Sequence, residues 1–195
     1  ACETAEGVDN AQAGEDGEFP PVESQQLWIT TDLTEAVTGS VTLSIQTFDG
    51  ETVHTETVDV ALDAHASESL VTVSREDLPD GVGPADVMVR ASWDGPGESY
   101  PATAFFADFK ELSLPATDLA VDIDGADVTV AAEHGALFVE LDPGTLSGAF
   151  SDNYVHLAPG EQRTLTFDSY EGRRDAVVEA RLREDLSVRH LRDTY

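Results

Sequence analysis

Lysine and cysteine are almost missing from this 195-residue sequence, since each occurs once, as Lys110 and Cys2. A single cysteine cannot form an internal disulfide, which excludes the disulfide framework of small secreted domains. Schiff-base enzymes, Ser-Lys dyads and P-loops all need a lysine beside particular neighbours. Ala107 stands three residues before Lys110, where a Ser-x-x-Lys nucleophile would stand. The lysine-dependent classes of enzyme are therefore excluded.

Long hydrophobic runs and aromatic side chains are also scarce. No apolar run approaches the ~20 residues that a membrane-spanning helix needs, so we expect no membrane partner. Hydrophobic residues make up 41% of the sequence and aromatic residues 7%. This is enough for thin cores between packed sheets, but it is little for a deep cleft lined with aromatic rings.

Positive charge is the third shortage. The sequence has 39 Asp and Glu against 10 Lys and Arg, which gives a formal net charge of −29. Such a surface repels nucleic-acid phosphates and anionic lipids, so we expect no nucleic-acid partner. Self-repulsion destabilises a compact fold unless salt screens it, and the Debye length falls to about 3 Å at 1 M salt. We therefore expect a halophile's protein in a high-salt cytoplasm. An acidic mesophilic domain accounts for the Asp and Glu but not for the single lysine.

The sequence does contain many short alternating runs bounded by turn residues. Residues 1–24 have little apolar content and predict an acidic linker or the end of an upstream domain. Residues 25–109 hold six or seven strand-like runs, and the pair Asp49-Gly50 between two of them predicts a β-hairpin. This number of strands predicts an immunoglobulin-like β-sandwich.

A second series of alternating runs fills residues 110–195. Pro115 separates the two series, because proline cannot donate a hydrogen bond in the middle of a sheet. One segment departs from the period of two: Val178, Leu182 and Leu186 recur every four residues, so a short helix fits it as well as a strand. The expected fold class is all-β, with two consecutive immunoglobulin-like antiparallel β-sandwiches.

One loop of the second series contains Ser151, Asp152 and Asn153, a Ser-Asp-Asn triplet like that of serine β-lactamases and penicillin-binding enzymes. Those enzymes also need Ser-x-x-Lys and Lys-Thr-Gly motifs, and Lys110 fits neither. Phe150, just before the triplet, is expected to end a strand that faces the core. We therefore interpret the loop as the corner of a sandwich and expect no catalytic residue in it.

The polar residues of this corner each have a structural interpretation. Asp152 and Asn153 bond readily to nearby backbone amides and tolerate left-handed conformations. Tyr154 is expected to reach a main-chain group with its hydroxyl, as in a tyrosine corner. The pair Pro159-Gly160 predicts a type II turn, because proline suits the second position and glycine accepts a positive φ at the third.

Metal and cofactor sites are not expected. The five histidines include no pair at i, i+2 or i, i+4 spacing, so a zinc site is disfavoured. The stretch Asp122–Asp127 resembles the start of a calcium loop, but it lacks glycine at the sixth position. A hairpin turn is the favoured interpretation of this stretch, and weak calcium binding stays open.

Trp28 and Trp93 are candidates for carbohydrate binding, because tryptophan rings can form stacking platforms. Both lie in strand-like runs, so a place in a core or an interface is the favoured interpretation. Paired carboxylates could carry out glycoside hydrolysis, but with 39 acidic residues close pairs arise by chance, and none is singled out as catalytic.

The corner also carries a family resemblance. FSDNYVHLAPGEQRTLTF, residues 150–167, resembles the signature of the C-terminal immunoglobulin-like domain of β-mannosidases in glycoside hydrolase family 2. FFADFKELSLP, residues 105–115, resembles the junction with the sandwich before it. LSVRHLRDTY, residues 186–195, is similar to the end of such enzymes, and residues 27–51 are similar to the opening of the penultimate domain.

The resemblance implies a retaining exo-glycosidase that removes terminal β-linked mannose, with two catalytic glutamates on a (β/α)₈ barrel. A barrel takes about 250 residues, and this sequence shows no alternation of strands with long helices, so no catalytic residue is transferred to it. We expect a non-catalytic C-terminal scaffold region whose partner is an upstream (β/α)₈ barrel, with a glycan as a further candidate partner. Two alternatives stay open: a carbohydrate-binding module that uses Trp28 or Trp93, and an independent adhesion protein.

Overall fold

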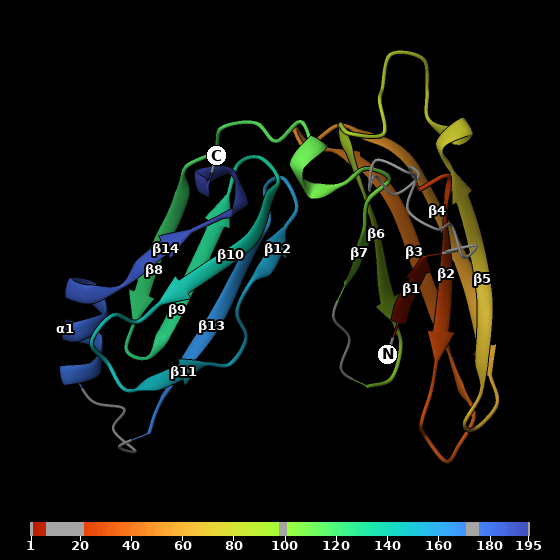
Figure 1. Cartoon of the computed structure of the whole chain (residues 1–195). Coiled ribbons are helices and arrows are strands. Elements are labelled where there is room, and N and C mark those ends of the chain that lie inside the picture. The colour runs from red at the N-terminus through yellow and green to blue at the C-terminus, as the bar shows by residue number, and fades with distance from the viewer. Residues whose placement is uncertain (1, 7–21, 98–100, 171–175, 195) are drawn as a thin grey trace, which may run out of the picture. The chain divides into compact units, whose positions relative to one another are not determined.

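The computed structural model describes residues 2–6, 22–97, 101–170 and 176–194 (Figure 1). Backbone contacts divide the chain into two units. The first unit holds residues up to 47 and residues 51–113, and the second holds residues 114–195 together with 48–50. Each unit has two antiparallel sheets and a hydrophobic core of its own. The predicted all-β fold class is therefore confirmed.

The described part of the first unit forms seven strands in two sheets. One sheet has the order β1-β2-β5 and the other has the order β4-β3-β6-β7. The strands are β1 Cys2–Glu6, β2 Ser24–Thr30, β3 Val37–Thr47, β4 Thr52–Leu62, β5 Ser67–Ser74, β6 Val87–Asp94 and β7 Ala102–Ala104. Short 3₁₀ helices span Arg75–Asp77 and Phe109–Glu111.

The core of the first unit follows from the period of two in its strands. In β3, Val41, Leu43 and Ile45 are each at most 2% exposed, and the residues between them are less buried. The same core cluster contains Leu27 of β2 and Val89 of β6, so both sheets contribute to it. Two sheets that share one core form a β-sandwich.

The β3–β4 hairpin forms where the Asp-Gly pair predicts it. Gly50 adopts φ +103°, a conformation that side chains disfavour. The Thr47 N–H donates to the Glu51 carbonyl (2.8 Å). The two strands then pair from Gln46 opposite Thr52 to the far end of β4. The hairpin prediction is therefore confirmed.

The described part of the second unit also forms two sheets, with strand orders β12-β10-β14 and β11-β13-β9-β8. The strands are β8 Leu119–Asp124, β9 Asp127–Ala132, β10 Ala136–Asp142, β11 Gly148–Phe150, β12 Val155–Leu157, β13 Gln162–Ser169 and β14 Ser187–Arg189. A 3₁₀ helix spans Leu191–Thr194. The strands β12 and β14 have three residues each, which is too short to show a period in the sequence.

The segment with the period of four is a helix. It is α1, Ala176–Asp185, and it buries Val178 and Leu182, which are 3% and 0% exposed. Glu179 and Arg183 form an i, i+4 ion pair with an N···O distance of 2.9 Å. A four-residue repeat places apolar side chains on one helical face, so packing on the core favours the helix over a strand.

Residues 1–24 were predicted to be an acidic linker or the end of an upstream domain, and their first described residues instead form a strand of the first unit. Cys2–Glu6 forms β1, which pairs with β2 from Cys2 opposite Ile29 to Glu6 opposite Gln25, whereas residues 7–21 lie outside the described residues. β1 is the edge strand of its sheet. Backbone hydrogen bonds from one neighbour can add such a strand, so it does not need the apolar alternation on which the linker prediction relied.

No helix in the described parts of the chain is long and apolar enough to cross a membrane.

Candidate functional site

The predicted corner lies between β11 and β13 of the second unit (Figure 1). Ser151 extends the pairing of these strands, because its N–H donates to the Thr166 carbonyl (2.8 Å) and its hydroxyl accepts from the Thr166 N–H (3.1 Å). Asp152 accepts from the Asn153 N–H (2.8 Å) and lies 3.5 Å from the Arg163 guanidinium. The Ser151 hydroxyl thus holds the backbone of β13, and among the described residues it is not paired with a general base.

Asn153 is the centre of the corner. β10 and β12 pair at Val139 opposite Val155, so the next position of this register places Leu141 opposite residue 153. There the Asn153 side chain replaces a backbone partner: its Oδ1 accepts from the Leu141 N–H (2.8 Å) and its Nδ2 donates to the Leu141 carbonyl (3.0 Å). Oδ1 also accepts from the Tyr154 N–H (3.0 Å). The side-chain amide of Asn153 therefore extends the pairing with β10 beyond the end of β12, where the backbone no longer pairs.

Tyr154 departs from the predicted tyrosine corner. Its hydroxyl donates to the Glu140 carboxylate (2.9 Å) and not to the main chain, and its side chain is 56% exposed. Tyr154 has a left-handed backbone, with φ +57°. The sequence analysis expected this conformation one or two positions earlier, at Asp152 or Asn153. The sequence did not reveal Glu140 as a partner, because that residue lies on a different strand.

The Glu140 carboxylate also accepts a hydrogen bond from the Arg189 guanidinium. Hydrogen bonds from Arg189 and then from Tyr154 hold the pKa of Glu140 below its ordinary value. Glu140 in turn raises the pKa of the Tyr154 hydroxyl. The general acid of a glycosidase needs a raised carboxyl pKa, so the shift of Glu140 has the wrong sign for that role.

Pro159 and Gly160 lie at the centre of a β-turn. The Glu161 N–H donates to the Ala158 carbonyl (2.9 Å), and Gly160 has φ +75°. The Glu161 carboxylate accepts from the Ala158 N–H (2.8 Å), which closes the turn from its other side. These contacts serve the backbone of the turn itself.

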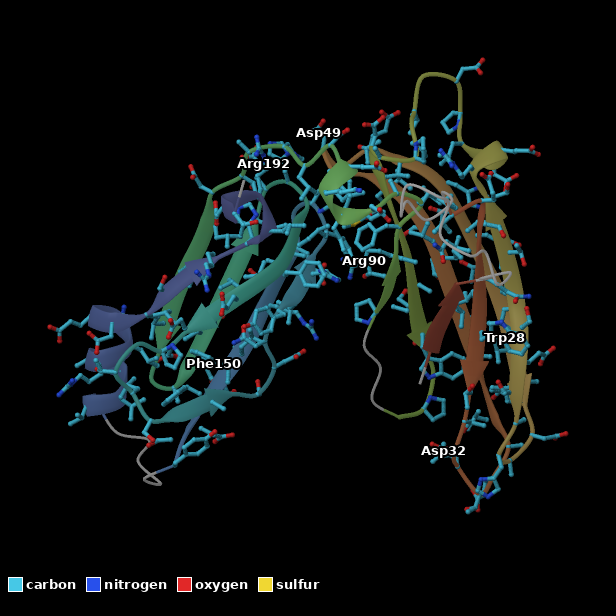
Figure 2. The ribbon with its side chains drawn as sticks, in the orientation of Figure 1. Trp28, Asp32, Asp49, Arg90, Phe150 and Arg192 are labelled. Carbon is cyan, nitrogen blue, oxygen red and sulfur yellow. The ribbon has the colours of Figure 1, made fainter. Side chains whose placement is uncertain are left out.

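Phe150, labelled in Figure 2, is partly buried against the core of the second unit. Its ring meets the Phe167 ring edge to face, with 5.3 Å between the ring centroids. Phe150 and Phe167 are also register partners in the β11–β13 pairing, so the contact joins the two strands.

Trp93 packs against the core of the first unit. Its indole lies over Gly39 and Gly95, where an added Cβ would come closer than 3 Å to the ring. The indole N–H donates to the Pro96 carbonyl (3.1 Å). The two glycines make room for the ring, so the contacts of Trp93 are those of a packed structural residue.

Trp28, unlike Trp93, lies on the outward side of a sheet, β1-β2-β5 (Figure 2). Buried and partly exposed residues alternate along β2, and Trp28 is one of the partly exposed ones. Its indole N–H donates to Gln26 Oε1 (3.0 Å), and Gln26 Nε2 donates to the Ser69 hydroxyl (2.9 Å). Thr30 and Ser67 are joined by a hydrogen bond of 2.9 Å beside them.

The sequence analysis singled out Trp28 as a candidate but not the residues beside it. Gln26 stands two positions before it, and the period of two would have placed both on one face. Ser69 is the register partner of Trp28 on β5 after a bulge, and nothing local in the sequence indicates that pairing.

The second unit has a hollow of about 590 Å³ beside β8, α1 and β14. Leu119, Val121 and Val188 line part of it, together with His190, which is 4% exposed. His190 Nε2 lies 3.2 Å from the Thr117 carbonyl, and its Nδ1 has no hydrogen-bond partner among the described residues. The lining also includes two carboxylates, those of Asp118 and Asp193, and the Arg183 guanidinium.

Within the described residues, no group of three or more His, Cys, Asp or Glu side chains is placed to hold a metal. His156 Nδ1 accepts from the Phe138 N–H (3.1 Å), so this ring supports a backbone group. The calcium-like stretch forms the turn between β8 and β9, where Gly125 has φ +63°. The favoured hairpin interpretation of this stretch is confirmed.

Comparisons with known proteins relate both halves of the chain to glycosidases. Residues 23–111 match the family model described as a Mannosidase Ig/CBM-like domain, and residues 111–194 match the mannosidase model described as an Ig-fold domain. No curated protein matches the sequence significantly.

Among solved structures, the chain is similar to a β-D-mannosidase from Dictyoglomus thermophilum, with 18% identity and a TM-score of 0.66 over 88% of this chain. It is also similar to an exo-chitosanase from Amycolatopsis orientalis, with 17% identity and a TM-score of 0.48 over 85% of this chain. The chain spans 21% of the length of the first protein and 24% of the second. The first likeness shows a shared fold.

Proposed function

From the two immunoglobulin-like domains of mannosidase type in residues 23–194, we propose that this chain is a non-catalytic accessory region of a β-mannosidase-like glycoside hydrolase. The proposed parent is a family 2 enzyme that removes terminal β-linked mannose from glycans. Its acid/base and nucleophile glutamates lie on a (β/α)₈ barrel upstream of the two sandwiches. The role of the sandwiches is mechanical: they pack on the barrel and hold the outer shape of the enzyme.

The corner is the observation that carries this proposal. Residues 150–167 lie inside the segment that matches the Ig-fold model, and several of their polar side chains bond to the backbone. Ser151 bonds to the backbone of β13, and Asn153 bonds to both backbone groups of Leu141. Because these side chains hold the backbone of the domain, we assign the segment a structural role and place the reaction on another domain of the parent.

We also propose that the parent works in a high-salt cytoplasm. The net charge of −29 and the single lysine support this environment. Salt screens the repulsion between neighbouring carboxylates and so favours the compact state.

The test has two parts. The purified chain is assayed with 4-nitrophenyl β-D-mannopyranoside across a range of KCl concentrations, and we expect no turnover above the protein-free rate. The parent gene is then read upstream of Ala1 and expressed with and without residues 111–194. We expect the deletion to lower the melting temperature of the parent while kcat per folded molecule stays within about twofold, because the deleted part touches no reacting atom.

Turnover by the purified chain would refute the non-catalytic role. An upstream sequence without a (β/α)₈ pattern would refute the assignment to a glycosidase. A loss of kcat in the folded, truncated parent, with KM unchanged, would show that the second sandwich contributes to the chemical step.

A further inference from the structure

We propose that the free edge of β8 binds an extended segment of a partner polypeptide, which adds an antiparallel strand to the sheet β11-β13-β9-β8. The segment has apolar residues at alternate positions and basic residues between them. This interaction goes beyond the mechanical role of the proposed function and does not depend on it. We call the outward backbone groups of Leu119 and Val121 the β8 edge.

The backbone groups of Leu119 and Val121 point away from the rest of the sheet. β8 is an edge strand, and its Leu119 pairs with Ala132 of β9 in an antiparallel register without a bulge. Ala132 uses its own backbone groups on its other side, because its N–H donates to the Glu161 carbonyl (3.2 Å) and its carbonyl accepts from the Gly160 N–H (2.9 Å). Opposite residues of an antiparallel pair turn either toward each other or both away. Leu119 therefore presents its N–H and C=O at the free edge, and so does Val121 two positions later.

Side chains already occupy both ends of this free edge. His190 Nε2 lies 3.2 Å from the Thr117 carbonyl at one end, and Arg183 donates to the Ile123 carbonyl at the other. Among the described residues, no hydrogen bond reaches the two N–H and two C=O groups of the β8 edge between these ends. Four hydrogen bonds to an added strand can form there. Every pairing described in this sheet is antiparallel, so we expect the added strand to be antiparallel too.

The inward side of β8 is also incompletely covered. Leu119, Val121 and Ile123 share one side of the strand, and Ile123 belongs to the core of the second unit. Val121 is nevertheless 42% exposed, because the hollow of about 590 Å³ opens between β8 and β14, which are edge strands of the two sheets (Figure 1). Leu186 and Val188 also line the hollow. An added strand can place an apolar side chain here at every second position.

Charge decides which polypeptide fits this edge. Asp118 and Asp122 are exposed on either side of the free backbone groups. A second copy of β8, paired about Ala120, would set Asp118 of one chain opposite Asp122 of the other, and like charges opposite each other destabilise a sheet. A partner with Arg or Lys at these positions places opposite charges there instead. The Arg183 guanidinium that lines the hollow is paired with Glu179 (2.9 Å), so it does not cancel this preference.

The experiment titrates a short peptide into the intact chain by isothermal titration calorimetry. The probe is the peptide Arg-Val-Arg-Val-Arg, acetylated and amidated at its ends, in KCl at a concentration where circular dichroism shows the chain folded. We expect saturable binding of one peptide per chain, with a Kd below about 1 mM. The peptide Glu-Val-Glu-Val-Glu should bind at least about tenfold more weakly, because it places like charges beside Asp118 and Asp122.

N-methylated peptides separate strand pairing from simple attraction between charges. In antiparallel pairing the two valine N–H groups face the β8 edge, so N-methylation of both valines should weaken binding by about tenfold or more. The matched control is the same peptide N-methylated at two of its arginines. It has the same charge and the same number of methyl groups, but the N–H groups that it loses point away from β8, so it should bind within about threefold of the unmodified peptide.

Variants of the chain test the edge from the other side. Val121→Pro removes an N–H that no described residue uses, and proline is tolerated on edge strands, so the melting temperature should stay near that of the wild type while peptide binding falls by about tenfold or more. If this variant does not fold, the N-methylated peptides test the same pairing on the wild-type chain.

A pair of double variants tests the charge preference. Asp118→Asn with Asp122→Asn should weaken binding of the basic peptide by about threefold or more, since two facing charges are lost. The matched control is Asp32→Asn with Asp80→Asn, which removes the same charge from exposed positions of the first unit and should bind within about twofold of the wild type.

The proposal is overturned if the basic peptide does not bind saturably, if the two N-methylated peptides bind equally, or if folded Val121→Pro binds like the wild type. Equal losses in the two double variants, or equal binding of the acidic peptide, would overturn it as well. A concentration-dependent dimer that Val121→Pro abolishes would assign the edge to a second copy and so contradict the proposed partner. None of these results uses the parent's activity, so a negative result leaves the mechanical role standing.

Discussion

Asn153 shows how much of the second sandwich depends on one side chain. Its amide bonds to both backbone groups of Leu141, which is 1% exposed, and water cannot easily replace it there. A buried backbone group that loses its partner keeps the full cost of desolvation. The same reasoning explains why asparagine stands at this position, since aspartate cannot donate to the Leu141 carbonyl.

We predict that Asn153→Ala lowers the free energy of unfolding by about 2–4 kcal/mol, because two buried backbone groups lose their partners. Urea denaturation followed by circular dichroism measures this. Asp152→Asn is the control, since an amide oxygen can still accept from the Asn153 N–H, and it should cost less than about 1 kcal/mol. Equal losses in the two variants would contradict the role assigned to Asn153.

A second prediction at this scale concerns pH and Glu140. Its pKa is lowered in the folded state from 4.5, so its ionised form stabilises the fold above that pH, and this contribution is lost as pH falls through the folded-state pKa. Glu140→Gln should therefore lower the melting temperature at pH 7, and the difference from the wild type should shrink as the pH falls through the folded-state pKa of Glu140. Tyr154→Phe, which removes one of the two donors, should show a smaller effect of the same sign. A Glu140→Gln difference that is constant with pH would rule out this ion pair as its source.

At the scale of elements, α1 shows why periodicity alone left an alternative open. The helix has ten residues, so its apolar face is short. A strand could bury some of the same side chains, and the repeat in the sequence therefore fits both structures. Packing favours the helix over the strand, because Val178 and Leu182 both belong to the core of the second unit when the segment is helical. The helix also places Glu179 and Arg183 one turn apart.

A pair of substitutions in α1 tests this packing. Leu182→Ala should destabilise the protein by about 2–5 kcal/mol, because it removes a fully buried side chain. Val177→Ala, in the same helix but 55% exposed, should be neutral or stabilise by up to about 0.7 kcal/mol, since alanine favours helices more than valine does. Chemical denaturation measures both. A destabilising Val177→Ala would indicate a strand, where valine is preferred.

For the whole molecule, charge is the dominant quantity. With 39 acidic and 10 basic side chains, most carboxylates lack a cation of their own, so compaction brings like charges together. Exposed ion pairs such as the one between Lys110 and Asp108 (3.8 Å) offset little of this repulsion.

We predict that the melting temperature rises steeply between about 0.02 and 0.5 M KCl, the range in which the Debye length falls from roughly 20 Å to about 4 Å. Differential scanning calorimetry measures it. Sorbitol at equal osmolality is the control, because it does not screen charge. A melting temperature that is flat or falling in KCl would contradict control by self-repulsion and would remove the physical basis for a high-salt environment.

The sequence by itself determined the all-β class and the β3–β4 and β8–β9 hairpins. These features are local, because they depend on alternation over a few residues and on turn chemistry at Gly50 and Gly125. Tertiary structure decided the rest. β1 joins its sheet through β2, Tyr154 bonds to Glu140, and Ser69 lies opposite Trp28. Each of these contacts joins residues distant in the chain, and the pairing of strands that creates them is set by the packing of complete sheets.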